Sequence, residues 1–426
     1  MKPQVGGMAL IYSMPIFQSC FLALALLVSG PLALHAQTAS PPVERALQIV
    51  KDDNGWTLQN QRSICEIPAP PFKEERRAAE YRRRFEALGL EVRIDSVGNV
   101  IARRPGRSSS PAVVLAAHLD TVFPEGTDLT IHQRGDTLRV PGISDDCRGL
   151  AVLLAVARAL DLAKVETTGP ILFVGTVGEE GAGNLRGVRY FFDQAPSGSV
   201  GFFLAVDLAR TELASVATGS NRYEYLITGP GGHSFNAFGM PNPIHAMGRA
   251  IARIADINVP PTPKTTFNVG VVRGGTSVNA IADTASFLVD LRSESAAELA
   301  RLDSTVQQIG EAAVAEERRR WPGSAVPIAL TRRTIGLRPA GSTPDSSLIV
   351  RVALEAAARL GITPDAGPHS TDANIPISRG IPAIAIGHGG MSGGEHSLSE
   401  WYLDGPDGYR GTQWVLLVAA RLGGTR

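Results

Sequence analysis

The sequence predicts an α/β fold, with a parallel or mixed sheet covered by helices and a smaller α/β domain inserted into it. Apolar, strand-like runs alternate with helical patterns through the first half of the chain, which is typical of such a sheet. Near Thr218 the alternation changes to a compact unit of its own, and it resumes after Trp321 and Pro322. We therefore expect one larger domain, split in sequence around a second one, as the length of 426 residues also suggests.

The elements of the larger domain are read from apolar periodicity and from the residues that end each run. A strong helical pattern at 74–88 stops at Gly89, and an apolar helix is expected at 150–160. After the insertion, a helix is expected at 345–360 and a strand at 383–386. Strands in the first part are expected at 91–94, 100–102, 112–117, 170–177 and 200–206.

The inserted unit is expected to hold three strands and two helices. A glycine-rich turn, Gly229 to Ser234, follows its first strand, and a long helix from residue 296 to about 320 ends it. We place the larger domain at 41–217 and 326–426 and the inserted domain at 218–325. The expected elements between are strands at 223–228, 266–272 and 285–291 and a helix at 243–255.

Composition excludes some classes of function. The chain is 44% hydrophobic and 19% charged with no formal net charge, which is ordinary for a globular protein. This balance gives no support for a nucleic-acid partner. There is no His-Glu-x-x-His, P-loop or Gly-x-Gly-x-x-Gly pattern, so single-zinc proteases, P-loop NTPases and dinucleotide enzymes lack support.

Residues 1–36 have the pattern of a secretory signal peptide. Lys2 precedes an almost wholly apolar run at 21–34, and Ala36 marks a plausible cleavage site. The alternative is a membrane anchor, but Gly30 and Pro31 interrupt the run and it falls short of roughly 20 residues. We expect a cleaved signal, export to the periplasm or medium, and no membrane partner after cleavage.

His118 and Asp120 are the first candidate site residues. They end the apolar run at 112–117, and residues two apart on a strand point to the same side. A histidine beside a carboxylate is the local pattern of a metal ligand and its orienting partner. The pattern is weak by itself, because most histidines are surface residues or satisfied core residues.

Further acidic residues and a histidine stand at expected strand or helix ends: Asp145, Glu179, Glu180, Asp207 and His396. Each has a structural alternative. Asp145 or Asp146 could cap the following helix, the glutamates or Asp207 could lie in solvated turns, and His396 could lie in a surface loop. Ligands in open α/β sheets bind beyond the carboxyl ends of strands, where most of these residues are expected. Together they form a suitable ligand set for two divalent metal ions such as zinc.

Four motifs carry a resemblance to a known family. They are Gly142-Ile-Ser-Asp145-Asp146, Glu179-Glu180-Gly-Ala-Gly, Gly229-Pro-Gly-Gly-His233-Ser234 and Gly394-Glu-His396-Ser-Leu-Ser-Glu400-Trp401. In order and from about residue 55 to the end, the chain resembles the di-zinc exopeptidases. This family includes peptidase T, glutamate carboxypeptidases, aminoacylases and succinyl-diaminopimelate desuccinylase, and the spacing is most similar to peptidase T-like members. The resemblance implies a phosphorylase/hydrolase-like catalytic domain and an inserted lid that serves as a dimerisation domain.

The resemblance also implies roles for the candidate residues. His118, Asp145 and Asp207 would hold one metal, and Asp145 would bridge to a second held by Glu180 and His396. Asp120 would orient His118, and Glu179 would be the general base for a hydroxide shared by the two metals.

The lid supplies three further candidates. His233 resembles a residue that reaches a partner subunit's active site and stabilises the oxyanion, although it could be a turn histidine without a role. Arg292 resembles a clamp for a substrate carboxylate, although it could pair with Asp290 or Glu294 on the surface. Asn279 is an assisting substrate-binding candidate.

The expected activity is an exported metallo-exopeptidase that acts on short peptides, with an N-acyl-amino-acid deacylase as the alternative. A homodimer through the lid is expected. A serine hydrolase is disfavoured because only His396 follows Ser392, and a non-enzymatic scaffold is disfavoured because every expected ligand is present. Many family members carry Lys at the position of Cys147. Its thiol could be inert, could pair with Cys65 or could touch metal, and an inert thiol is the expectation.

Overall fold

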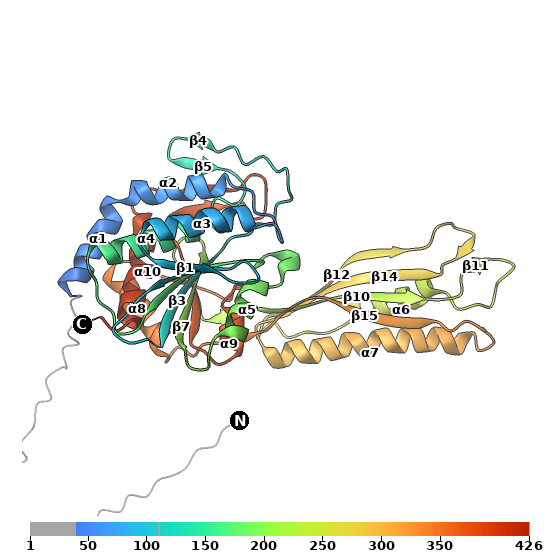
Figure 1. Ribbon diagram of the computed structural model, residues 1–426. Coiled ribbons are helices and arrows are strands. Elements are labelled where there is room, and N and C mark those ends of the chain that lie inside the picture. The colour runs from blue at the N-terminus through green and yellow to red at the C-terminus, as the bar shows by residue number, and fades with distance from the viewer. Residues whose placement is uncertain (1–39, 110, 426) are drawn as a thin grey trace, which may run out of the picture. The chain divides into compact units, whose positions relative to one another are not determined.

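The computed structural model describes residues 40–109 and 111–425 of the chain (Figure 1). The predicted signal peptide lies outside these residues. Within the described part of the chain, no helix is long and apolar enough to cross a membrane.

The larger domain is built on an eight-stranded mixed sheet, which confirms the predicted fold class. Neighbouring strands β6, β3, β7 and β18 run parallel, whereas β2 is antiparallel to β6 and β8 is antiparallel to β18. In spatial order the strands are β1 (Glu91–Ile94), β2 (Val100–Arg104), β6 (Ile171–Thr176), β3 (Ala112–His118), β7 (Val200–Leu208), β18 (Ala383–Gly387), β8 (Glu212–Ala214) and β17 (Asp365–Ala366).

Helices cover both faces of this sheet (Figure 1). One face is covered by α3 (Glu75–Ala87), α4 (Cys147–Leu162), α8 (Leu348–Arg359) and α10 (Tyr409–Leu422). Outside this layer, α1 (Pro41–Asp52) packs on α4 and α10, and α2 (Asn54–Cys65) packs on α4. The other is covered by α5 (Arg186–Gln194) and α9 (Asn374–Ser378). Helices α1 and α2 were not predicted from the sequence.

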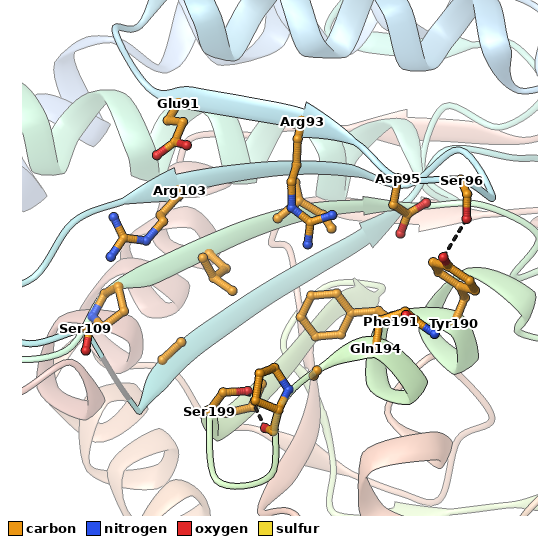
Figure 2. Close-up of a pocket in the computed structure, with 17 residues that line it drawn as sticks. Glu91, Arg93, Asp95, Ser96, Arg103, Ser109, Tyr190, Phe191, Gln194 and Ser199 are labelled. Atoms are coloured by element: carbon orange, nitrogen blue, oxygen red, sulfur yellow. Dashed lines mark hydrogen bonds between the residues drawn. The ribbon is translucent and has the colours of Figure 1, made fainter.

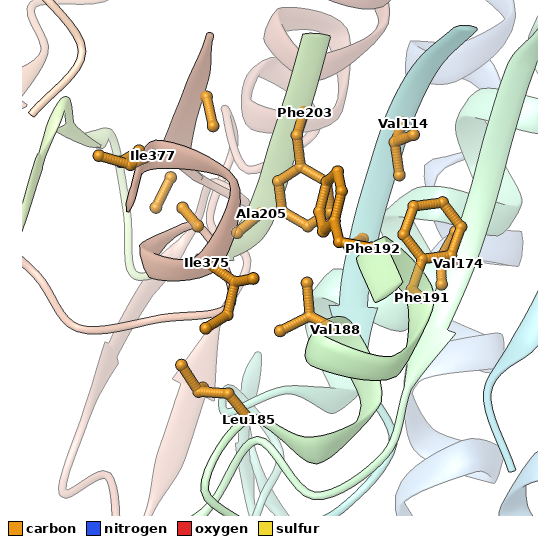
Figure 3. Close-up of a cluster of buried hydrophobic side chains, with 14 of the residues drawn as sticks. Val114, Val174, Leu185, Val188, Phe191, Phe192, Phe203, Ala205, Ile375 and Ile377 are labelled. Carbon is orange, nitrogen blue, oxygen red and sulfur yellow. The ribbon is translucent and has the colours of Figure 1, made fainter. Parts of the chain in front are cut away.

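The core beneath α5 and α9 shows why these short helices hold their place. Phe191 and Phe192 of α5 pack with Phe203 of β7 and Ile375 of α9 in one buried cluster (Figure 3). Burial of large apolar side chains is the main stabilising contribution to such a layer. This packing fixes the strands whose ends carry the candidate site.

The inserted domain is an antiparallel sheet with two helices on one face. Its strands alternate in burial: Tyr223, Tyr225 and Ile227 face the helices, whereas Arg222 and Glu224 face away. The strands, in spatial order, are β12 (Thr265–Gly274), β14 (Thr284–Ser293), β10 (Gly219–Thr228) and β15 (Ala329–Arg338), and the helices are α6 (Pro243–Ala255) and α7 (Ala296–Arg320).

Strand β15 corrects the expected end of this domain at residue 325. It pairs with β10 along its length, so the inserted sheet continues to Arg338. This strand was not predicted because seven of its ten residues are exposed and several are arginines, which hides the apolar signal.

Short elements complete the fold. A four-stranded sheet in the order β19-β20-β5-β4 contains β4 (His132–Arg134), β5 (Thr137–Arg139), β19 (Met391–Gly393) and β20 (Trp401–Leu403). Two strand pairs are β9 (Val216–Ala217) with β16 (Gly341–Ser342), where the inserted domain joins the larger one, and β11 (Gly232–His233) with β13 (Ala280–Ile281).

Cys65 and Cys147 form a disulfide, with a Cα–Cα distance of 5.5 Å. The expectation of an inert thiol at Cys147 was therefore wrong. The pairing links the last residue of α2 to the first residue of α4, and the sequence could not show it because the two residues are 82 positions apart.

Candidate metal centre

The candidate centre forms where three parallel strands end side by side. His118 is the last residue of β3, Asp207 lies near the end of β7, and Glu179 and Glu180 follow β6. Carboxyl ends of neighbouring parallel strands share one edge of the sheet, so the three segments must present these side chains together. Asp145 comes from the turn before α4 and His396 from the loop between β19 and β20.

The structure brings all five expected ligands together. Potential ligand atoms of His118, Asp145 and Asp207 lie within 4.8 Å of one another, and so do those of Asp145, Glu180 and His396. Asp145 joins the two groups. Its Oδ1 lies 2.7 Å from His118 Nε2, and its Oδ2 lies 2.9 Å from His396 Nε2. This two-sided carboxylate is the arrangement that a residue bridging two cations requires.

Asp120 contacts His118 through its backbone carbonyl and not through the carboxylate that the sequence pattern suggested. His118 Nδ1 donates to the backbone carbonyl of Asp120 at 3.0 Å, while the Asp120 carboxylate lies 3.7 Å away. That carboxylate instead accepts the backbone N–H groups of Glu179 and Glu180, at 3.0 and 2.9 Å. Asp120 thus orients His118 with its carbonyl, and its side chain holds the turn that carries both glutamates.

The two aspartates before α4 have separate tasks. Asp146, and not Asp145, caps the helix by accepting from Gly149 N at 2.9 Å, and its other oxygen accepts from His118 N. Gly149 is required here, because a Cβ at that position would lie 2.0 Å from the carbonyl oxygen of Val206. The close approach of α4 to β7 leaves Asp145 free to face the cluster.

Glu400 holds the Asp145 turn from the opposite side. Its buried carboxylate accepts three backbone N–H groups, from Gly142 at 2.7 Å, Ser144 at 2.8 Å and Asp145 at 3.1 Å. Glu400 stands in the last of the four sequence motifs, but no task was predicted for it. Its contacts could not be read locally, because the partners are more than 250 positions away.

The charges of the cluster suit divalent cations. Burial raises the pKa of Glu180 and of Asp207, because each carboxylate is removed from water. Hydrogen bonds that His396 donates to the carboxylates of Asp145 and Glu180 raise its pKa to about 11. Three carboxylates and two imidazoles that converge in this way need positive charge to compensate them, and oxygen and nitrogen donors of this kind suit zinc and similar ions.

Glu179 lies beside the ligands and contacts a residue that the sequence analysis missed. Arg338, the last residue of β15, donates from Nη1 to Glu179 Oε1 at 2.8 Å and from Nη2 to the Glu179 carbonyl. Both side chains are buried. Burial raises the pKa of Glu179 well above its ordinary value, and the Arg338 guanidinium opposes this shift. The strand end of the inserted domain therefore holds the expected general base.

A cavity of about 430 Å³ opens on the cluster, and residues of both domains line it. The larger domain contributes Asp145, Glu179 and His396, and the inserted domain contributes Arg222, Arg292 and Arg338. Arg292, predicted as a carboxylate clamp, is thus in the same cavity as the cluster. Its Nε donates to Asp290 at 2.9 Å, so the surface pairing considered as its alternative is also present.

A larger cavity of about 470 Å³ lies elsewhere, against β1, β2 and α5 (Figure 2). Its walls include Ala112 and Val200, which begin the strands that end near the cluster. This cavity is therefore at the opposite ends of β3 and β7 and contains none of the expected ligands.

The structure does not bring His233 and Asn279 into the cavity that contains the cluster. His233 is exposed on β11, and the backbone N–H of the next residue, Ser234, donates to the Asn279 carbonyl at 2.9 Å. Strand β11 follows the far end of β10, about 20 Å along that strand from Arg222. A role for these two residues in catalysis would require a second copy of the chain.

Comparisons with known proteins agree with this geometry. A family model described as a peptidase dimerisation domain matches residues 217–318, and the model of peptidase family M28 matches residues 99–235. An uncharacterised protein of Bacillus subtilis, YqjE, is 25% identical over 367 residues, which are 82% of this chain and 90% of the relative.

Solved structures share the fold. A tripeptidase from Staphylococcus aureus superposes with a TM-score of 0.72 at 21% identity, covering 86% of this chain and 98% of that one. A dinuclear metal binding peptidase of the M20 family from Bacillus subtilis gives a TM-score of 0.65 at 19% identity, covering 87% and 99%. The two partial family matches and the shared fold agree with the resemblance to the di-zinc exopeptidases that the motifs carry, and they support a hydrolase acting on peptide bonds.

Proposed function

We propose that this protein is an exported exopeptidase that hydrolyses short peptides at a centre of two zinc ions. The observation that carries the proposal is the meeting of His118, Asp145, Asp207, Glu180 and His396 in two overlapping groups beside Glu179. Asp145 would belong to both groups, since it lies between the two histidines.

The cations would supply Lewis-acid polarisation of the scissile carbonyl and a lowered pKa for the attacking water. Glu179 would accept the proton of that water and pass it to the leaving amine. Glu179 is suited to this task because it is next in sequence to the expected ligand Glu180. Arg338 holds its side chain, and the Asp120 carboxylate accepts the backbone N–H groups of both glutamates. Arg292 would bind the carboxylate of the substrate residue on the lid side.

We also propose a homodimer through the inserted domain, in which His233 and Asn279 would complete the partner's site. Phe235, Phe238 and Val278, close to them in sequence, expose large apolar side chains, as a surface for a second copy would. Export is supported by the apolar pattern at 21–34 and by the Cys65–Cys147 disulfide, since disulfides persist in oxidising compartments.

The test is a panel of dipeptides, tripeptides and N-acetyl amino acids, assayed with and without a chelator. Glu179→Gln should keep two metal ions per chain but lower kcat by about 10²-fold or more, because it lacks the general base. Glu91→Gln, the same substitution on the exposed strand β1, is the matched control and should retain full activity.

Each outcome of this test has a defined meaning. Hydrolysis of N-acetyl amino acids without peptide hydrolysis would replace the exopeptidase by a deacylase. Equal activity of Glu179→Gln and wild type would refute the base assignment, and no hydrolysis of any substrate by zinc-loaded wild type would refute the proposed function.

A further inference from the structure

The outward face of the inserted sheet carries two arginines that flank one carboxylate. Arg222 on β10 is directly opposite Asp290 on β14, and Arg292 is two residues farther along β14 on the same face. Asp290 Oδ1 accepts from Arg222 Nε at 3.3 Å, and Asp290 Oδ2 accepts from Arg292 Nε at 2.9 Å. The aspartate therefore sets the spacing of two guanidinium groups.

Both guanidiniums engage Asp290 only through Nε. Among the described residues, the Nη atoms of Arg222 and Arg292 have no hydrogen-bond partner. Other arginines of this sheet behave differently: Arg332 uses Nη1 to bind Asp303, and Arg333 uses Nη2 to bind Glu224. The free Nη ends of Arg222 and Arg292 are the part of the side chain that recognises carboxylates in a forked geometry.

These two residues line the cavity that also contains Glu179 and Glu180. The side chain of Arg222 is 29% solvent-exposed and that of Arg292 is 42% solvent-exposed, so an incoming ligand can reach them. Gly336 on β15 lies opposite Arg222 and places no side chain beside it. Two arginines and one aspartate leave one net positive charge, whereas the charge of Arg338 is balanced by Glu179.

We propose that Arg222 and Arg292 together bind the two carboxylates of an acidic residue, glutamate or aspartate, at the substrate position on the lid side of the scissile bond. This inference rests on the proposed function. Arg292 would hold the α-carboxylate and Arg222 the side-chain carboxylate. Diagonal neighbours on adjacent strands lie about 7–8 Å apart. Two long arginine side chains can bring their guanidinium groups closer together than this, to the distance between the two carboxylates of glutamate or aspartate. Arg222 is thus a specificity-determining residue that neither the motifs nor the family models assign.

Matched substrates test the inference. For zinc-loaded wild type, Ala-Glu should be cleaved with a kcat/KM about 10-fold to 100-fold above that of Ala-Gln, because a charge-assisted fork is lost with the amide. Arg222→Met should remove this preference, mainly by raising KM for Ala-Glu, and should leave Ala-Gln within about two-fold of wild type. Arg222→Lys should retain part of the preference, since it keeps the charge without the fork. Arg333→Met, elsewhere on the sheet, is the matched control and should keep the full preference.

A binding measurement separates this inference from the proposed function. Free L-glutamate should stabilise the protein against thermal unfolding more than L-glutamine does, and Arg222→Met should abolish the difference. This readout needs no hydrolysis, so glutamate binding that depends on Arg222 would support the inference even if no peptide were cleaved. Equal cleavage of Ala-Glu and Ala-Gln by wild type would overturn the inference and leave the proposed function intact. If a folded Arg222→Met variant lost the cleavage of both Ala-Glu and Ala-Gln, the inference would also be overturned, since that result points to a general structural task for Arg222.

Discussion

The Cys65–Cys147 disulfide should make a large contribution to stability, and its removal is the sharpest test of the described fold. The bond closes a loop of 82 residues between α2 and α4. In the chain-entropy description, a loop of this length stabilises the folded state by about 4.5 kcal/mol at 25 °C. For a chain of about 400 residues, this corresponds to a fall in Tm of roughly 5 °C when the bond is reduced.

The assay compares wild type with the double variant Cys65→Ala/Cys147→Ala, each melted with and without a strong reductant. Wild type should lose roughly 5 °C in the reduced state, whereas the double variant should melt at one temperature under both conditions. Removal of the bond should leave two metal ions per chain, because Glu400 and the Asp146 cap still hold the turn that carries Asp145.

Two results would refute this reasoning. One is the titration of two free thiols per chain in denatured, unreduced protein, which would show that the bond does not form. The other is a reduced wild type whose Tm equals that of the oxidised protein, which would show that the loop closure contributes nothing to stability.

Three further changes follow from the contacts of the candidate centre. Arg338→Met should lower kcat by about 10-fold to 100-fold, because breaking a buried pair leaves Glu179 without its partner, and added guanidinium should restore part of the rate. Glu400→Gln should weaken metal affinity by about 10-fold to 100-fold in a chelator competition, because one amide oxygen cannot satisfy three backbone donors. Burial and the neighbouring Arg148 lower the pKa of His388 to about 3, so the unfolded chain takes up its proton first as pH falls. The free energy of unfolding should therefore fall as the pH falls from about 6.5 toward 3. In urea unfolding measured across this pH range, His388→Gln should make the free energy of unfolding less dependent on pH.

Each of these changes has a control or a contradicting result. Arg338→Lys should recover part of the rate if charge holds Glu179, and an unchanged kcat in Arg338→Met would show that the pair has no part in catalysis. Metal affinity of Glu400→Gln equal to that of wild type would remove the supporting task from Glu400. A pH dependence of stability that is identical with and without His388 would exclude this histidine as its source.

The local pattern of the sequence was enough to predict the fold class and to place the candidate residues at one edge of the sheet, and the family resemblance singled out five of them as ligands. Apolar runs that end in His118, Glu180 and Asp207 mark strand ends, and parallel strands bring their ends to one edge. The change of pattern near Thr218 predicted the inserted domain, because a separate core needs its own alternation of apolar residues. These features depend on neighbouring residues in the chain, so they can be read from it.

Only the tertiary structure decided which side chains support those ligands. Arg338 reaches Glu179 across 159 positions, and Glu400 reaches Gly142 across 258. It also decided that Asp146 caps the helix, that Asp120 uses its carbonyl on His118, and that β15 extends the inserted sheet to Arg338. Periodicity and local motifs report which face of an element is apolar, but a contact between distant segments depends on how whole elements pack, and a single sequence carries no local sign of that packing.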